Sequence, residues 1–184
     1  MRIIAGELKG RRLVTPADNR VRPTTDKVKE AVFSMISAYL PDSVVVDLFA
    51  GTGNLGLEAI SRGAKRAYFV DRDRASISMI RENVKYCKVE DRSVIIWSDY
   101  AAALKKINDK VDVIFLDPPY TAGFIDKCME AIAESDILLD DGIIVAEHSA
   151  RDEVPDTIGG FVKFKEKRYG KINISVYEKQ EAES

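Results

Sequence analysis

The stretch VVVDLFAGTGNLGLEA, Val44 to Ala59, joins an apolar run to a glycine pattern and then to a helical segment. Its glycines form G-x-G-x-x-G, the pattern with which many sites hold a dinucleotide pyrophosphate between a strand and a helix. Asp47, however, stands four residues before the first glycine, Gly51. A carboxylate at that place would repel a pyrophosphate. The stretch therefore predicts a strand, a glycine turn and a helix, and it favours a ligand that carries positive charge.

On both sides of this stretch, apolar runs alternate with segments of helical periodicity. The predicted strands are Val44–Phe49, Ala67–Val70, Val94–Trp97, Val111–Leu116 and Ile143–Ala146. Near the end of the chain, VKFKEKRYGKINISVYEK predicts two alternating strands that turn around Gly170. Strands that alternate with helices indicate a parallel sheet with crossover connections. The predicted fold class is therefore α/β: a doubly wound, mostly parallel, Rossmann-like sheet with a C-terminal antiparallel hairpin.

Two helices carry clear signals. RPTTDKVKEAVFSMISAYL predicts a helix with Thr24 or Thr25 as its N-cap. Its inward residues are predicted to be Val28, Val32, Met35, Ile36 and Tyr39. A second apolar stripe, at spacings of three and four, consists of Ile77, Ile80, Val84 and Cys87. Gly63 is the predicted end of the helix between these two.

Length and composition limit the class of protein. With 184 residues, we expect a single domain, 1–184, in which a short basic N-terminal extension, 1–22, forms a hairpin and 23–184 forms the core. No apolar run approaches the roughly 20 residues needed to span a membrane, and the N-terminus lacks the apolar stretch of a signal peptide. We therefore expect a cytoplasmic protein without a membrane partner. Cys87 and Cys128 lack metal-type spacing, so no disulfide and no metal site are predicted.

Charge is distributed unevenly along the chain. Residues 1–29 contain eight basic and three acidic residues, whereas the net charge of the whole chain is −2. A cationic N-terminal segment on an acidic body is typical of an appendage that binds a polyanion. A solvated surface segment would have the same composition, so charge alone leaves both interpretations open.

Carboxylates end three successive predicted strands. A ligand with an ammonium and a sulfonium group would favour Asp47, and S-adenosylmethionine carries both. Asp71 lies 20 residues after Gly51, where it could accept from both ribose hydroxyls, and Asp99 could accept from the adenine amino group. Ligands of open α/β sheets bind at these strand ends. The predicted cofactor contacts are Asp47, Phe49, Gly51, Thr52, Gly53, Asn54, Asp71 and Asp99.

The run VDVIFLDPPY places Asp117, Pro118, Pro119 and Tyr120 directly after the fourth predicted strand. These residues would also form a rigid turn that ends a strand, because proline fixes φ and restrains its predecessor. They equally suit methyl transfer to an exocyclic amino group. The Asp117 carboxylate and a carbonyl of the proline turn could hold the two N–H bonds, and Tyr120 could stack on the base. No strong general base is needed before the transfer.

The motifs DLFAGTGNLGLEA, FVDRD and DPPY resemble those of class I S-adenosylmethionine-dependent methyltransferases that modify amino nitrogens. MRIIAGELKGRRL followed by RPTTDKVKEAVFSMI is similar to the N-terminus of bacterial RsmD-type enzymes, which methylate guanine N2 in small-subunit (16S) ribosomal RNA. The resemblance covers nearly the whole chain. It implies S-adenosylmethionine as the cofactor and this RNA, in a partly assembled ribonucleoprotein, as the partner.

The resemblance also assigns roles to residues. It makes Asp117 to Tyr120 the catalytic loop and puts Arg22, Pro23, Thr24 and Thr25 at the rim of the active site. Lys9, Arg11 and Arg12 are predicted to contact phosphates through a hairpin built on GELKGRRL, with Arg22 closer to the target nucleotide. One departure is Asp71, where relatives often carry glutamate, whose side chain is longer and reaches further toward a ribose.

Other functions fit part of the pattern. The same catalytic loop would suit adenine-N6 methylation of DNA. An NAD-binding oxidoreductase would explain the glycines, but Asp47 and DPPY speak against it. A non-catalytic RNA-binding module would not need an intact DPPY. His148 is interpreted as a structural residue, and Trp97 as a core or sheet residue.

Overall fold

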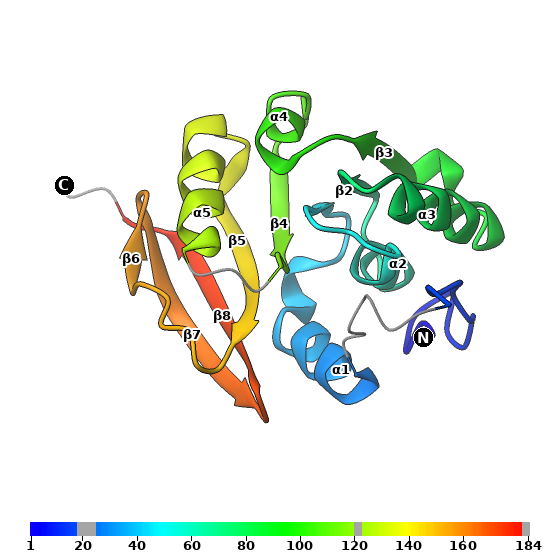
Figure 1. Cartoon of the computed structure of the whole chain (residues 1–184), viewed down its shortest axis with the longest axis horizontal. Coiled ribbons are helices and arrows are strands. Elements are labelled where there is room, and N and C mark those ends of the chain that lie inside the picture. The colour runs from blue at the N-terminus through cyan, green and yellow to red at the C-terminus, as the bar shows by residue number, and fades with distance from the viewer. Residues whose placement is uncertain (18–24, 120–122, 182–184) are drawn as a thin grey trace.

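The computed structural model describes residues 1–17, 25–119 and 123–181. Within these ranges the backbone forms an eight-stranded sheet in the order β3-β2-β1-β4-β5-β8-β7-β6 (Figure 1). The parallel strands are β1 (Val44–Asp47), β2 (Arg66–Asp71), β3 (Ser93–Trp97), β4 (Val111–Leu116) and β5 (Leu138–Ser149). The antiparallel strands are β8 (Ile172–Lys179), β7 (Phe161–Tyr169) and β6 (Thr157–Ile158). The predicted α/β class and the C-terminal antiparallel hairpin are confirmed.

The fifth strand is longer than its apolar run. Prediction placed it at Ile143–Ala146, but β5 already begins at Leu138. The register with β4 shifts along this part of β5, because Val111 pairs with Leu138 whereas Val113 pairs with Ile143. Asp140 and Asp141 in this part of the strand are exposed, so the apolar run in the sequence begins later than the strand itself.

Helices cover both faces of the sheet (Figure 1). One core cluster joins the sheet to α1 (Asp26–Met35), α2 (Asn54–Ser61) and α3 (Arg74–Tyr86). A second cluster, on the opposite face, joins it to α4 (Tyr100–Leu104) and α5 (Phe124–Ser135). Short 3-10 turns occur at Ser37–Tyr39 and Glu90–Arg92. The side chains of β1, β4 and β5 alternate between the two clusters, so these strands are buried on both faces.

The first helix begins at the predicted cap but ends early. The hydroxyl of Thr25 accepts from the backbone N–H of Val28, at 3.3 Å. The helix ends at Met35 and gives way to a 3-10 turn, which shifts the periodicity. Met35 and Tyr39 are therefore only half-buried, whereas Phe33, which the stripe left out, is fully buried.

The N-terminal segment, 1–14, packs on the body of the protein instead of projecting from it. Arg2 and Arg12 form an antiparallel bridge. Ile3, Leu8 and Leu13 are buried in the same cluster as α1, α2 and α3. The charge pattern suggested an appendage because it takes no account of these three apolar residues, which give the segment a hydrophobic face.

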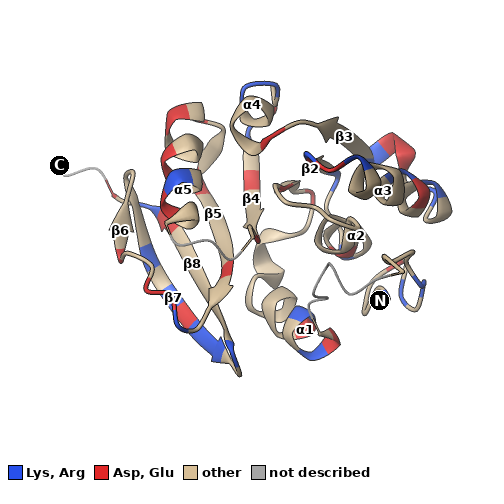
Figure 2. Cartoon of the chain, in the orientation of Figure 1, with Lys and Arg blue, Asp and Glu red and all other residues tan. Residues whose placement is uncertain are grey.

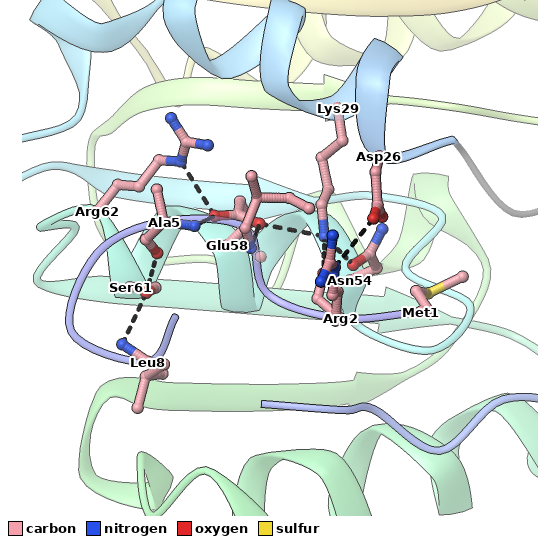
Figure 3. A network of polar contacts seen from close by, with 12 residues as sticks. Met1, Arg2, Ala5, Leu8, Asp26, Lys29, Asn54, Glu58, Ser61 and Arg62 are labelled. Atoms are coloured by element: carbon pink, nitrogen blue, oxygen red, sulfur yellow. Dashed lines mark hydrogen bonds and ion pairs between the residues drawn. The ribbon is translucent and has the colours of Figure 1, made fainter. Parts of the chain in front are cut away.

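A buried ion pair fixes this segment to the core. The side chains of Lys29 in α1 and Glu58 in α2 are both fully buried, and Nζ lies 3.1 Å from Oε1 (Figure 3). Glu58 also accepts from the backbone N–H groups of Ile4 (2.8 Å) and Ala5 (3.2 Å) and from Nε of Arg62 (3.0 Å). Burial lowers the pKa of Lys29, and the charge of Glu58 opposes this shift. The N-terminal backbone is thus part of a buried polar network.

Candidate active site

Three carboxyl groups meet at the carboxyl ends of β1, β4 and β5. Asp47 ends β1 and pairs with Phe115 of β4, so Asp117 comes two residues further along the same face. Leu116 pairs with Ala146, which brings Asp117 and Glu147 to the same level on neighbouring strands. Asp47 and Glu147 are buried, and Asp117 is half-buried. The sheet thus gathers the predicted Asp47 and Asp117 at one place and adds a third acid.

This crowding changes the acidity of the carboxyl groups. Burial raises the pKa of Asp47 to about 7, although its Oδ2 accepts from the N–H of Gly56 at 3.0 Å. The pKa of Asp117 is raised well above its ordinary value, first by burial and then by the charges of Glu147 and Asp47. A bound cation would favour the ionised forms of all three groups.

The glycine turn is tied to the end of β2. Asp71 accepts from the N–H of Gly51 through Oδ2 and from the N–H of Asp73 through Oδ1, both at 2.9 Å. Burial raises the pKa of Asp71. The predicted ribose contact would use lone pairs that these bonds leave, since a carboxylate has about four acceptor sites. Asp71 therefore shapes the turn as well as lying where a ribose is expected.

Two glycines of the motif have separate structural reasons. Gly53 precedes α2 with φ of +84°, a conformation that L-residues with side chains rarely adopt. A Cβ on Gly56 would lie 2.4 Å from Cε1 of Phe69, so this position allows α2 to approach β2 closely. The first requirement concerns the turn and the second the packing of the helix.

Thr52 and Asn54 use their side chains within the protein. The Thr52 hydroxyl donates to Sδ of Met1 (3.2 Å), and its carbonyl accepts from the Asn83 amide (2.9 Å). Oδ1 of Asn54 accepts from Nζ of Lys29 (2.8 Å). Both were predicted as cofactor contacts, and the structure places them where they brace the turn against the N-terminal segment and α1.

An aromatic cluster lies beside the turn. The ring centroids of Phe49, Tyr100 and Phe124 are 5.4 to 5.8 Å apart, and all three side chains are half-buried. Next to them, Asp99 caps α4 by accepting from the N–H of Ala102 at 2.9 Å. Such rings offer the flat apolar surface that an adenine needs. Of these rings only Phe49 was predicted, because Tyr100 and Phe124 belong to no sequence motif.

The predicted catalytic loop, Asp117 to Tyr120, is described only in part. Pro118 is buried and Pro119 is exposed, directly after Asp117. Tyr120 lies outside the described residues, as do Arg22, Pro23 and Thr24, so their predicted roles stay predictions.

Glu147 was missed although the sequence contains a signal for it. It comes directly after the apolar run Ile143–Ala146, just as Asp117 follows the run of β4. The next residue, His148, is buried, with Nε2 2.8 Å from the hydroxyl of Ser175 and Nδ1 3.0 Å from the carbonyl of Ser149. This placement agrees with the structural role predicted for the histidine.

The cations of the N-terminal segment differ in how they are held. Arg11 donates from Nη1 to the carbonyl of Tyr86 (3.1 Å), and its guanidinium lies 5.9 Å from the centre of that ring. Lys9 and Arg12 are exposed, and neither forms an ion pair within the described residues. They are therefore better placed than Arg11 to meet a polyanion.

Two further features concern the described part of the chain as a whole. None of its helices combines the length and apolar character needed to cross a membrane. Nor do these residues contain a group of three or more His, Cys, Asp or Glu side chains that could hold a metal ion.

Cys87 and Cys128 are both buried and unbonded, and burial raises the pKa of Cys128 to about 12.

Comparison with known proteins agrees with the fold and the motifs. The family model described as "Conserved hypothetical protein 95" matches residues 1–178. A Bacillus subtilis protein named "Putative rRNA methyltransferase YlbH" is 40% identical over 98% of this chain and 100% of its own length. The "Ribosomal RNA small subunit methyltransferase D" of Haemophilus influenzae is 32% identical over 97% of this chain and 93% of its own.

A solved structure gives the same result. The "Putative methyltransferase yhhF from Escherichia coli" superposes with a TM-score of 0.86 at 28% identity and covers 98% of both chains. The resemblance noted in the N-terminal motifs is thereby confirmed. The chain belongs to the family described as Conserved hypothetical protein 95, which it shares with proteins named ribosomal RNA small subunit methyltransferase D.

Proposed function

We propose that the protein transfers a methyl group from S-adenosylmethionine to the exocyclic N2 of a guanine in small-subunit (16S) ribosomal RNA. The observation that carries this proposal is the placement of Asp117 and Glu147 at the same level on β4 and β5. Membership of a family with members named as small-subunit ribosomal RNA methyltransferases supports the substrate class.

The carboxylates and the glycine turn fit the cofactor. Asp47 would face the positively charged methionine part, because a nearby cation lowers the cost of ionising a buried carboxyl group. Asp71 would accept from the ribose hydroxyls, and Asp99 with the ring of Phe49 would hold the adenine. When bound, the cofactor supplies an electrophilic methyl group on its sulfonium.

The pair of acids favours guanine over adenine as the target. The Watson–Crick edge of guanine presents the donors N1–H and N2–H₂ side by side, whereas adenine presents N6–H₂ beside N1, which is an acceptor. Asp117 would accept from N2–H and Glu147 from N1–H. An adenine N1 would instead face a carboxylate, and two acceptors repel each other.

The chemistry then follows from positioning. Asp117 and a carbonyl of the proline turn would hold the two N2–H bonds so that the nitrogen lone pair points at the methyl group. The bound cofactor would supply the methyl group for the new N–C bond, and the electron pair of the broken C–S bond would stay on its sulfur. The nitrogen becomes positively charged and then loses a proton, which the nearby Asp117 carboxylate can accept.

The rest of the chain would serve RNA binding. Lys9 and Arg12, with Arg11 and Arg22, would contact phosphates, and Thr24 and Thr25 would lie at the rim of the site. We take 1–184 to act as a single domain in the cytoplasm, on a partly assembled small subunit, with the target base unpaired or flipped so that it reaches Tyr120.

The decisive test compares ribosomal RNA from cells that lack the gene with RNA from complemented cells. One guanine should lose its N2-methyl group without the gene and regain it with the wild-type gene, but not with Asp117→Ala. Methyl groups lost from adenine in DNA would instead favour the adenine-N6 alternative. Calorimetry that detects binding of NAD but not of S-adenosylmethionine would overturn the proposal.

A further inference from the structure

A group of exposed cations surrounds the turn between β7 and β8. We call them the hairpin cations: Arg151, Lys165, Lys167, Arg168 and Lys171. Within the described residues, none of them forms an ion pair with a carboxylate. Lys163, on the same strand, behaves differently, since it pairs with Asp156 (3.2 Å) and Glu166 (2.6 Å). Lys167 lies 5.5 Å from the centre of the Tyr169 ring, and Nε of Arg168 donates to the carbonyl of Gly170 at 2.8 Å, but no carboxylate of the described residues neutralises the charge of the hairpin cations.

Strand pairing places this turn at the catalytic edge of the sheet. Ile172 of β8 pairs with Ser149 at the end of β5 and with Tyr169 at the end of β7. The N–H of Ala150 also donates to the carbonyl of Lys171, at 2.8 Å. Because β5 runs parallel to β4, its end lies at the edge where Asp117 follows β4. The turn and the catalytic loop thus belong to the same edge.

The distance between them suits a nucleic acid. β7 is the third strand from β4 in the order β4-β5-β8-β7. Lys167 of β7 pairs with Ile174 of β8, which pairs with Glu147 of β5, so at about 4.8 Å per strand Lys167 lies on the order of 14 Å across the sheet from the position of Asp117. That span corresponds to about four nucleotides of a stacked strand.

The N-terminal cations lie on the other side of the site. The N-terminal segment packs against α3 through Val14, whose N–H donates to Asn83 at 2.7 Å, and through Arg11 at Tyr86. The α3 helix covers β2 and β3, at the opposite end of the sheet from β7. Figure 2 shows basic residues at both places, with α1 between them in this view.

A simpler explanation is that lysines on an exposed strand prevent edge-to-edge aggregation. The short β6 pairs only with Phe161 and Val162, so the remainder of β7 has an open edge. This accounts for Lys165 and Lys167. It does not account for Arg151, which follows β5, or for Lys171, which precedes β8, because neither lies on that edge.

We propose that the hairpin cations form a second phosphate-binding surface, which holds the RNA backbone on the side of the catalytic loop opposite to Lys9 and Arg12. Two basic surfaces, one on each side of the acidic site, define the path along which the RNA backbone crosses the site. A single basic surface would leave that path open. This inference rests on the proposed function as an RNA methyltransferase.

The test compares two triple variants with equal loss of charge. The hairpin variant is Lys165→Gln, Lys167→Gln and Lys171→Gln. The matched control is Lys65→Gln, Lys105→Gln and Lys106→Gln, three exposed lysines at or near the amino-end edge of the sheet. Each is assayed for binding of 16S ribosomal RNA over a salt series, for methyl transfer, and for S-adenosylmethionine affinity by calorimetry.

The hairpin variant should bind RNA more weakly and show a log–log salt slope reduced by about 2, since each lost phosphate contact removes about 0.7 to 0.9. Its kcat/KM should fall with the affinity, whereas kcat at saturating RNA and cofactor affinity should stay within about twofold. RNA affinity and slope equal to those of the control would overturn the inference. So would self-association of the variant with unchanged RNA binding, which would show that the lysines only protect the edge. If the wild-type protein neither binds nor methylates this RNA, the proposed function itself is wrong. That result differs from the two outcomes above, both of which concern the hairpin variant.

Discussion

Asp117 and Glu147 directly follow a pair of neighbours in the parallel sheet, because Leu116 of β4 pairs with Ala146 of β5. Ionising two carboxyl groups this close together in a buried place costs free energy. The raised pKa of Asp117, caused by burial and by the charge of Glu147, reflects this cost. Such a cost is tolerated where a ligand offsets it. A base edge with adjacent N–H donors is such a ligand.

The role of Glu147 in choosing the base can be tested with 2-aminopurine, which keeps the 2-amino group but has an acceptor at N1. The wild-type protein should strongly prefer guanine at the target position. Glu147→Gln presents an amide N–H₂ that can donate to N1 of the analogue. We expect the ratio of kcat/KM for guanine over 2-aminopurine to fall by about tenfold or more. Glu178→Gln, at an exposed glutamate of β8, should leave the ratio unchanged. If this ratio of kcat/KM is the same in all three proteins, Glu147 has no role in base recognition.

Asp117 should matter for chemistry more than for the cofactor. Asp117→Ala removes the proposed acceptor for N2–H, so the methyl-transfer rate at saturating RNA should fall by about 10² or more. S-adenosylmethionine affinity, measured by calorimetry, should stay within about threefold, because the proposed partner of Asp117 is the base. A variant with the wild-type rate would mean that Asp-Pro-Pro only ends the strand.

The pKa of Asp47 predicts how cofactor affinity depends on pH. Below about pH 7 this carboxyl group is largely protonated in the free protein, and only its ionised form attracts a sulfonium and an ammonium. S-adenosylmethionine affinity should therefore rise by about tenfold in total between pH 6 and pH 8, as the ionised fraction of Asp47 in the free protein goes from about 0.1 to about 0.9. Asp47→Asn should bind the cofactor weakly at both pH values and lose the dependence. Parallel pH profiles for the two proteins would contradict this role.

The same shift predicts that Asp47 destabilises the cofactor-free protein. Its pKa is about 7 when folded and 3.8 ordinarily, so between these values the folded state holds a proton that the unfolded state has lost. The free energy of unfolding should then fall as pH rises through this interval. Asp47→Asn keeps an acceptor for Gly56 and should raise that free energy at pH 8 by up to about 4 kcal/mol. Urea unfolding at pH 5 and pH 8 measures the effect, and a variant that is less stable than wild type at pH 8 would contradict it.

Much of the site could be predicted from sequence because its signals are local. Asp47 and Asp117 each follow an apolar run, and the glycine pattern lies within one turn. The relation between Asp117 and Glu147 is not local, since it depends on β4 and β5 being neighbours in register. The ring cluster of Phe49, Tyr100 and Phe124 likewise joins three elements that only the fold brings together.

The N-terminal segment shows the same limit. Its charge was evident from composition, but its attachment depends on the buried Glu58, which the sequence shows only as one polar residue in an apolar helix. Lys29 is one of the eight basic residues counted in 1–29, and it is fully buried. Pairing between two charged residues 29 positions apart follows from the packing of α1 on α2.

That buried pair provides a final prediction, on stability. Lys29→Met or Glu58→Gln alone leaves one charge buried with fewer partners, and each should lower the free energy of unfolding by about 3 to 5 kcal/mol. The double variant should lose less than the sum, because it removes both charges. Arg2→Gln, which breaks the exposed pair with Asp26, should cost less than about 1 kcal/mol.

Urea unfolding of the four proteins and the wild type gives the coupling energy. Limited proteolysis should also cut the Lys29→Met protein faster within 1–14, because Glu58 holds the N–H groups of Ile4 and Ala5 from inside the same network. Additive losses with no change in proteolysis would mean that Lys29 and Glu58 stabilise the core separately and that hydrophobic burial of Ile3, Leu8 and Leu13 alone holds the segment in place.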